Sequence, residues 1–103
     1  MASYRLTRKA EDDLDRLYER GIRDYGVQQA DAFYDGLIER LERIAETPKL
    51  YQAVDFIRPG YRRSVYKRLS IYFRIESESV VISCLIERQL PILDHELEEM
   101  KDT

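Results

Sequence analysis

The sequence predicts an α+β fold in which an antiparallel pair of helices packs on an antiparallel sheet. Between residues 8 and 47 apolar side chains recur at spacings of three and four, the period of a half-buried helix. Between residues 61 and 86 apolar and polar side chains mostly alternate, the period of a strand. Helical and strand patterns that are segregated along a chain indicate the α+β class. A length of 103 residues suits one domain, so we expect residues 1–103 to form a single unit.

A short first strand is expected at residues 4–7, where apolar and polar side chains alternate. Thr7 is the expected N-cap of the first helix, because its hydroxyl oxygen can accept a hydrogen bond from the first helical turn. Acidic residues follow at positions 11–13, near the positive end of the helix dipole. The apolar stripe of this helix is Leu14, Leu17, Tyr18, Ile22 and Tyr25. Gly26 is predicted to end the helix in the left-handed conformation.

A second helix repeats the pattern, with an apolar stripe made of Ala30, Phe33, Tyr34, Leu37, Ile38, Leu41 and Ile44. It is predicted to end before Pro48, because the residue that precedes a proline disfavours helical geometry. Only one or two residues around Gly26 separate the two helices. So short a connection predicts that the helices pack as an antiparallel hairpin.

The rest of the chain predicts a β-meander. Turn signals stand at residues 58–60, 67–68 and 76–78. The expected strands between and after them are residues 61–66, 69–75 and 80–86. The last strand is nearly continuous in apolar side chains, as expected for a strand covered on both faces. Short connections between neighbouring strands imply antiparallel pairing, with the helical hairpin covering one face of the sheet.

Charge and hydropathy limit the class of protein. The chain has 17 Lys and Arg against 20 Asp and Glu, whereas a protein that grips phosphate backbones is usually basic. We therefore expect no sequence-specific nucleic-acid binding by this chain alone, although a local basic patch remains compatible. No apolar run approaches the roughly 20 residues that span a bilayer, and a single Cys84 makes no internal disulfide. We expect a cytoplasmic protein without membrane association, and an acidic C-terminal tail or short helix at about residues 93–103.

The common catalytic and cofactor sites are not predicted. The four glycines are scattered, so no Gly-rich phosphate loop is expected. One cysteine and one histidine cannot build a zinc site of the usual type, and no metal or cofactor is expected. The histidine, His95, lies between Asp94 and Glu96, whose carboxylates repel phosphate groups. No catalytic residue is assigned.

Several segments, taken in their order along the chain, resemble the ParE-type toxins of the RelE/ParE superfamily. They are Tyr4-Arg5-Leu6-Thr7 followed by Ala10-Glu11 and Asp13-Leu14, then Arg58-Pro59-Gly60-Tyr61-Arg62, Ile71-Tyr72-Phe73-Arg74-Ile75 and Glu87-Arg88-Gln89. The resemblance spans nearly the whole chain. It implies the RelE/ParE-like fold, with an N-terminal strand, a helical hairpin and a meander.

The resemblance implies the toxin component of a type II toxin–antitoxin system. Such a toxin inhibits DNA gyrase by binding it, and a ParD-like antitoxin neutralises it by laying an amphipathic segment along it in a hetero-oligomer. This interpretation makes the chain a protein-binding inhibitor rather than an enzyme. Two alternatives stay open: a RelE-like ribosome-dependent mRNA endonuclease, and a non-toxic relative that keeps only antitoxin binding.

Six of the 17 cations fall between Arg58 and Arg74, a stretch without an acid. One interpretation is a solvated strand face whose cations discourage edge pairing, and another is pairing with the chain's own carboxylates. A third, favoured by the resemblance, is binding of partners through arginine forks. On that interpretation the target-binding residues are Arg62, Lys67, Arg74 and Arg88, and Arg74 also binds the antitoxin. Arg62 and Arg74 are expected to project from the sheet side by side.

Three tyrosines on the helical stripes carry a similar ambiguity. They are either core residues whose hydroxyl groups lie at the rim, or part of a groove for the antitoxin. The predicted antitoxin-binding set is Tyr18, Tyr25, Tyr34, Leu37 and Arg74.

Overall fold

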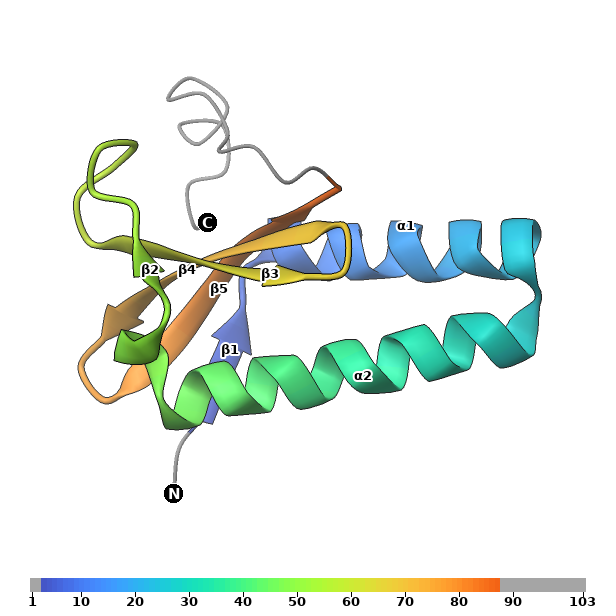
Figure 1. Ribbon diagram of the computed structural model, residues 1–103, viewed down its shortest axis with the longest axis horizontal. Coiled ribbons are helices and arrows are strands. Elements are labelled where there is room, and N and C mark those ends of the chain that lie inside the picture. The colour runs from blue at the N-terminus through green and yellow to red at the C-terminus, as the bar shows by residue number, and fades with distance from the viewer. Residues whose placement is uncertain (1–2, 88–103) are drawn as a thin grey trace.

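The computed structural model describes residues 3–87. The fold has two layers, a five-stranded sheet and two helices that lie side by side on one of its faces (Figure 1). The helices are α1 (Arg8–Tyr25) and α2 (Val27–Glu46), followed by the short 3-10 helix η1 (Pro48–Leu50). The strands are β1 (Ser3–Leu6), β2 (Gln52–Ala53), β3 (Tyr61–Tyr66), β4 (Leu69–Glu76) and β5 (Ser79–Ile86). The expected acidic tail or helix at residues 93–103 lies outside the described residues.

The strand order in the sheet is β1-β5-β4-β3-β2. Antiparallel pairing of β3, β4 and β5 confirms the predicted meander. β1 pairs in parallel with β5, and the unpredicted β2 pairs antiparallel with β3 at the other edge. The fold is therefore α+β as expected, with a sheet that is wider than the meander and mixed in direction.

Backbone hydrogen bonds define the ends of the helical hairpin. Thr7 Oγ1 accepts a hydrogen bond from the Ala10 N–H at 3.1 Å, which confirms Thr7 as the N-cap of α1. Gly26 ends α1 by donating its N–H to the Ile22 carbonyl, and it begins α2 because its own carbonyl accepts from the Ala30 N–H. The prediction that Gly26 adopts the left-handed helical conformation was wrong, because its φ is 93° and its ψ is 163°. A residue that serves as both caps needs the extended ψ of an N-cap, and glycine tolerates the positive φ.

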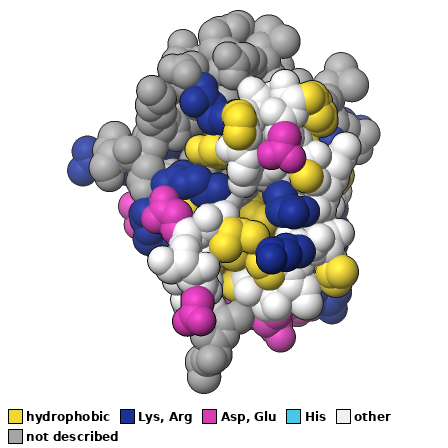
Figure 2. Space-filling view, turned by 90° about the vertical axis from the view of Figure 1, so that its left-hand side faces the viewer, with side chains coloured by type: hydrophobic (Ala, Val, Ile, Leu, Met, Phe, Trp, Pro, Cys, Tyr) yellow, Lys and Arg dark blue, Asp and Glu magenta, His cyan; other side chains and the backbone are white. Residues whose placement is uncertain are grey.

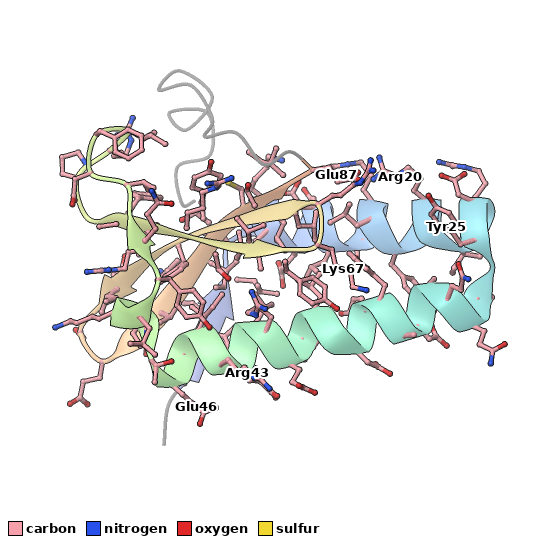
Figure 3. All side chains as sticks on the ribbon, viewed as in Figure 1. Arg20, Tyr25, Arg43, Glu46, Lys67 and Glu87 are labelled. Carbon is pink, nitrogen blue, oxygen red and sulfur yellow. The ribbon has the colours of Figure 1, made fainter. Side chains whose placement is uncertain are left out.

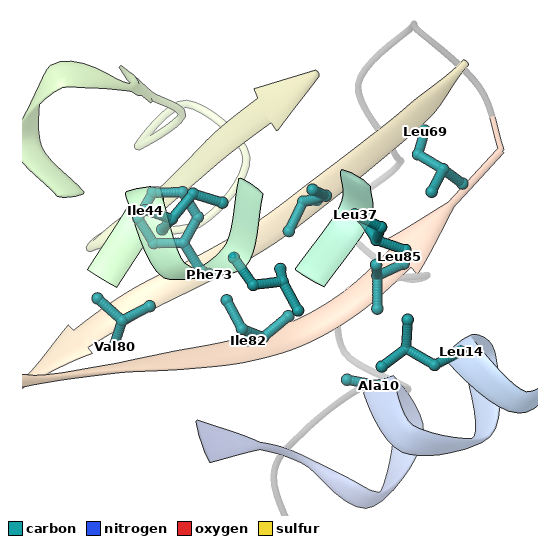
Figure 4. Close-up of a cluster of buried hydrophobic side chains, with 11 residues drawn as sticks. Ala10, Leu14, Leu37, Ile44, Leu69, Phe73, Val80, Ile82 and Leu85 are labelled. Atoms are coloured by element: carbon teal, nitrogen blue, oxygen red, sulfur yellow. The ribbon is translucent and has the colours of Figure 1, made fainter. Parts of the chain in front are cut away.

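The main core fills the space between the helices and the sheet (Figure 4). Its buried side chains include Leu14 of α1, Leu37 of α2, Phe73 of β4 and Ile82 of β5. Each such side chain stabilises the folded state by about 1.5–3 kcal/mol through burial. A second cluster lies on the opposite face of the sheet and comprises Val54, Tyr61, Tyr72 and Cys84, with Ile57 and Ile86 packed against it. β5 is thus buried on both faces, as its apolar run predicted, and Cys84 is a buried residue.

Two side chains near the start of α1 fasten it to β5. Asp13 is fully buried, and its carboxylate accepts hydrogen bonds from the Leu85 N–H at 3.0 Å and the Arg16 guanidinium at 2.8 Å. Thr7 Oγ1 donates to the Ser83 carbonyl at 2.9 Å. Ser83 is the extra residue of β5 at the register shift against β4, a β-bulge. The carboxylate that was expected only to add charge near the helix dipole therefore joins the two layers.

A groove beside the helical hairpin

The helical hairpin extends beyond the strands (Figure 1). An open groove of about 830 Å³ is lined by the distal half of the hairpin and by the β3–β4 turn. Small and apolar side chains make the floor of this groove: Leu17, Gly21, Ala30 and Phe33. Tyr25, which is 72% exposed, lines its open end. The groove continues the core layer to a place where the strands no longer cover the helices.

Close approach of the two helices shapes the groove floor. A Cβ atom added to Gly21 would lie 3.4 Å from the Cβ of Ala30, so α1 and α2 meet there through their smallest side chains. The separation of packed helices follows the size of the side chains at their contact. Larger residues at these two positions would fill the floor and push the helices apart.

Charged side chains border the groove (Figure 3). Lys67 and Arg68 come from the β3–β4 turn, and Arg20 of α1 forms an ion pair with Glu87, directly after β5. An apolar floor with cations at its border suits a segment that carries apolar side chains on one side and carboxylates beside them.

Tyr66, the last residue of β3, fixes the β3–β4 turn relative to α2. Its ring centroid lies 5.6 Å from that of Phe33 and 5.4 Å from the Arg40 guanidinium carbon. The Lys67 ammonium lies 5.8 Å from the same ring, a second cation–π contact. The Tyr66 hydroxyl lies over Gly36, where an added Cβ would be 2.1 Å from the hydroxyl oxygen. Glycine at position 36 therefore makes room for the residue that holds this border of the groove.

The structure separates the three tyrosines of the predicted antitoxin-binding set. Tyr18 and Tyr25 line the groove, whereas Tyr34 meets Tyr18 edge to face with ring centroids 5.5 Å apart. The Tyr18 hydroxyl donates a hydrogen bond to Asp31 at 2.5 Å, which raises the pKa of Tyr18 because the bond requires the neutral phenol. Of the three, Tyr25 presents the most of its ring to solvent.

The position of Leu37 contradicts its place in the predicted antitoxin-binding set. Its side chain is 1% exposed and packs in the main core between α2 and the sheet. A side chain with so little exposed area offers no surface to a partner, so Leu37 is a core residue. The sheet covers the apolar stripe of α2 at Leu37. Nearer the N-terminus of α2, at Phe33 and Ala30, the stripe lines the groove.

The two arginines that were expected to project side by side lie on opposite faces of the sheet. Arg62 is the cross-strand partner of Phe73, which belongs to the main core, whereas Arg74 is the partner of Tyr61 in the second cluster. Directly opposed residues share a face of a sheet, and successive residues alternate between faces. The expectation that the two arginines project side by side was therefore wrong, because positions 62 and 74 lie on different faces of the β3–β4 pair.

Both arginines are engaged within the chain. Arg62 donates to the Tyr51 carbonyl at 2.7 Å. Arg74 has a side chain that is 20% exposed and donates to the Glu76 carboxylate at 2.7 Å. Hydrogen bonding and charge from Arg74 lower the pKa of Glu76. Pairing with the chain's own carboxylates, one interpretation of the basic stretch, is thus present at Arg74, and the binding roles of both arginines stay predictions.

Of the other predicted target-binding residues, Lys67 lines the groove and Arg88 lies outside the described residues. Two features of the groove were not predicted, the small Gly21 in its floor and the Arg20–Glu87 pair at its border. Gly21 follows Leu17 by four positions, and this spacing is a signal that could have identified it. An ion pair between α1 and the end of β5 leaves no signal in the local sequence.

Within residues 3–87 no three or more His, Cys, Asp and Glu side chains gather to hold a metal ion. No helix in the same range is long and apolar enough to cross a membrane. The groove combines apolar side chains, an exposed tyrosine and a border of three cations and two carboxylates, features that suit an amphipathic peptide segment.

An N-terminal strand, a helical hairpin and a meander are the layout that the resemblance to RelE/ParE-type toxins predicted, and the described fold has it. A family model described as the ParE toxin of type II toxin-antitoxin system, parDE, matches residues 4–89. The chain belongs to this ParE toxin family.

Individual relatives agree with the family. The chain is 33% identical over 85 residues to Toxin ParE1 of Caulobacter vibrioides, covering 82% of this chain and 88% of the relative. It is 28% identical over 78 residues to Toxin ParE1 of Mycobacterium tuberculosis, covering 76% of this chain and 80% of the relative. A solved structure titled the chromosomal ParDE TA system from P. aeruginosa superposes with a TM-score of 0.75 at 22% identity, covering 86% and 98% of the two chains. This last likeness shows a shared fold.

Proposed function

We propose that this ParE-type toxin inhibits DNA gyrase by binding it, without catalysis, and that a ParD-like antitoxin neutralises it by placing an amphipathic helix in the groove. The observation that carries the antitoxin assignment is the apolar floor that the strands leave uncovered, ending at the exposed Tyr25. The solved structure with the same fold carries a title that names a ParDE system, which supports an antitoxin as the partner. A gyrase target places the protein in the cytoplasm.

The groove fits a partner helix with apolar residues at spacings of three and four. Such residues would cover Leu17 and Phe33 and the small pair between them. Carboxylates of the partner helix would lie opposite Lys67 and Arg68 of the β3–β4 turn. Tyr25 would close the end of the contact, because tyrosine buries a large area with few rotatable bonds.

The gyrase assignment rests on family membership and on the charge of one region. Residues 47–75 hold seven Lys and Arg and one Asp, whereas the chain as a whole is acidic. Within this region Lys67 borders the groove, while Arg62 and Arg74 help to hold the fold. Our candidates for gyrase contact remain Arg62, Lys67, Arg74 and Arg88.

The antitoxin assignment is tested by calorimetric titration of the toxin with a purified ParD-like antitoxin. Tyr25→Ala is expected to weaken binding at least tenfold, because an exposed aromatic side chain that becomes buried is a typical hot spot. Gln28→Ala, an exposed residue that does not line the groove, is the matched control and should change binding less than twofold. Equal binding by both variants would remove Tyr25 from the interface.

The gyrase assignment is tested by a supercoiling assay with purified gyrase. Inhibition and a rise in cleaved DNA at micromolar toxin are the expected results, and the absence of both would overturn the assignment. Primer extension on translated mRNA serves as the control for catalysis. Codon-phased cuts in that experiment would overturn the assignment of gyrase inhibition in favour of RelE-like mRNA cleavage.

A further inference from the structure

A second exposed apolar region lies at the opposite end of the molecule from the hairpin tip (Figure 1). Leu50 is 81% exposed and Phe56 is 71% exposed. Both belong to the connection between α2 and β3, and they flank the two-residue edge strand β2. Burial of these side chains would be favourable. Exposed apolar side chains in one segment are therefore candidates for contact with a partner.

The loop that carries Phe56 is held by hydrogen bonds at both of its ends. The Val54 N–H donates to the Tyr61 carbonyl at 2.8 Å, and the Gly60 N–H donates to Asp55 Oδ1 at 2.8 Å. The Val54 carbonyl accepts from the N–H groups of the third and fourth residues after it at 2.8 and 3.2 Å. Val54 itself is fully buried in the second cluster. Phe56 therefore stands on a fixed turn, and little conformational entropy is lost when a partner covers it.

Cations lie beside Leu50 and β2. Across the sheet β2 pairs with Arg62 and Arg63, and the Arg62 guanidinium contacts the backbone carbonyls on either side of Leu50. Residues 47–63 contain four Lys and Arg and one Asp, and the carboxylate of that Asp55 accepts the Gly60 N–H. Figure 2, which looks onto this end, shows hydrophobic and Lys or Arg side chains next to one another. Glu46 and Glu78 line a hollow beside Leu50, so acidic groups of a partner would lie opposite the cations of residues 47–63 and not over the whole region.

We infer that Leu50, Phe56 and the cations beside β2 form a second protein-binding surface, here named the β2 edge surface. Its occupant is an acidic surface of the toxin's protein target, with apolar hollows that receive Leu50 and Phe56. This inference rests on the proposed function, which supplies gyrase as the probe. It goes further by adding a target contact at the end of the molecule away from the antitoxin groove, at whose border the candidate Lys67 lies.

A protein fits this surface better than a nucleic acid does. The Arg62 guanidinium is already engaged by two backbone carbonyls, and Asp55 adds a negative charge next to Phe56. A DNA duplex offers a row of phosphates, which are bound by several cations together. Two exposed apolar side chains in a segment that also carries cations instead match the anchors of a protein interface.

The test compares Phe56→Ser and Leu50→Ser with the control Val27→Ser, which removes a side chain that is 56% exposed at the hairpin end. Binding to immobilised purified gyrase and growth arrest on expression are measured, and antitoxin affinity is measured by calorimetry. Phe56→Ser should weaken gyrase binding at least tenfold and Leu50→Ser at least threefold. Both should leave antitoxin affinity and the melting temperature as in the wild type. Tyr25→Ser should show the reverse pattern.

The outcomes are distinguishable. Wild-type gyrase binding by Phe56→Ser and Leu50→Ser overturns the β2 edge surface and leaves the proposed function intact. Loss of antitoxin binding together with gyrase binding, in a folded variant, also overturns it, because the two contacts would then share one surface. A wild-type chain that neither binds gyrase nor arrests growth overturns both the proposed function and the inference. Direct binding of a DNA duplex that Phe56→Ser abolishes would overturn the choice of a protein occupant.

Discussion

The groove and the β2 edge surface lie at opposite ends of the molecule, and they are built in different ways. The groove is a hollow that exists because two long helices extend past the strands, so its shape depends on the packing of the whole fold. The β2 edge surface combines Leu50 at the end of η1 with the turn that carries Phe56, and a few hydrogen bonds hold that turn. On our proposals the groove receives the side chains of a partner, whereas the β2 edge surface inserts its own. Substitutions should therefore affect the two ends independently, unless they disturb the core between them.

The largest effect is expected for Asp13→Ala, which disturbs that core. The substitution leaves the buried Leu85 N–H without its acceptor and removes the ion pairs of Asp13 with Lys9 and Arg16. We expect the free energy of unfolding to fall by about 3 kcal/mol, measured by urea denaturation. The exposed neighbour Asp12 is the control, and Asp12→Ala should change this free energy by less than about 0.5 kcal/mol. Equal losses in the two variants would contradict the role of Asp13.

Gly36→Ala should disturb the groove end alone. The added Cβ would overlap the Tyr66 hydroxyl, so the ring has to leave its place between Phe33 and Arg40. We expect a loss of about 1–2 kcal/mol in stability, even though alanine is the better helix former, together with weaker antitoxin binding. In the Tyr66→Phe background the same substitution should cost less, because the clashing oxygen is gone. A cost that is equal in both backgrounds would show that the hydroxyl is not the cause.

Asp55→Ala should loosen the β2 edge surface alone. It removes the acceptor of the Gly60 N–H, a net loss of about 0.5–1.5 kcal/mol that is confined to the loop. Amide hydrogen exchange at Gly60 should accelerate while the amides of β4 and β5 keep their protection. Gyrase binding should weaken a few-fold, because Phe56 must then be ordered on binding, and antitoxin affinity should not change. Unchanged amide exchange at Gly60 would show that the Asp55 side chain does not stabilise the loop.

The smallest effect is expected at Glu76, the last residue of β4. Arg74 holds the pKa of this carboxyl below its ordinary value of 4.5 in the folded state. A lowered pKa stabilises the fold above the ordinary value, and the contribution is lost as the pH falls through the folded-state pKa. The stability difference between wild type and Glu76→Gln should therefore be present at pH 7 and vanish on acidification. Thermal unfolding at several pH values measures it, and a difference that persists at low pH would contradict this assignment.

Local pattern predicted most of the fold. The N-cap Thr7, the two helical stripes and the three meander strands all follow from spacings within a few residues. Pairings between distant segments were not predictable in this way. The parallel pairing of β1 with β5, the two-residue β2 and the bulge at Ser83 depend on contacts across the sheet.

For the candidate sites too, local pattern was informative and contacts between distant segments were not predictable. Tyr18 and Tyr25 were predicted for antitoxin binding and Lys67 for target binding from residue type and position; all three line one groove, and their binding roles stay predictions. Leu37 lies on the same helical stripe but at the point where the sheet covers it, which no helical period can reveal. The opposite faces of Arg62 and Arg74 follow from strand register, which the alternation pattern of each strand leaves undetermined.

The parallel pairing of β1 with β5 also sets the order in which this protein can be completed during synthesis. β1 is synthesised well before its partner in the sheet, β5, which is the last strand of the described fold. Chains grow at about 5–20 residues per second, so for several seconds the nascent hairpin has no sheet on which to bury its apolar face. The groove therefore takes its final shape only after β5 is translated, because Glu87 at its border directly follows that strand.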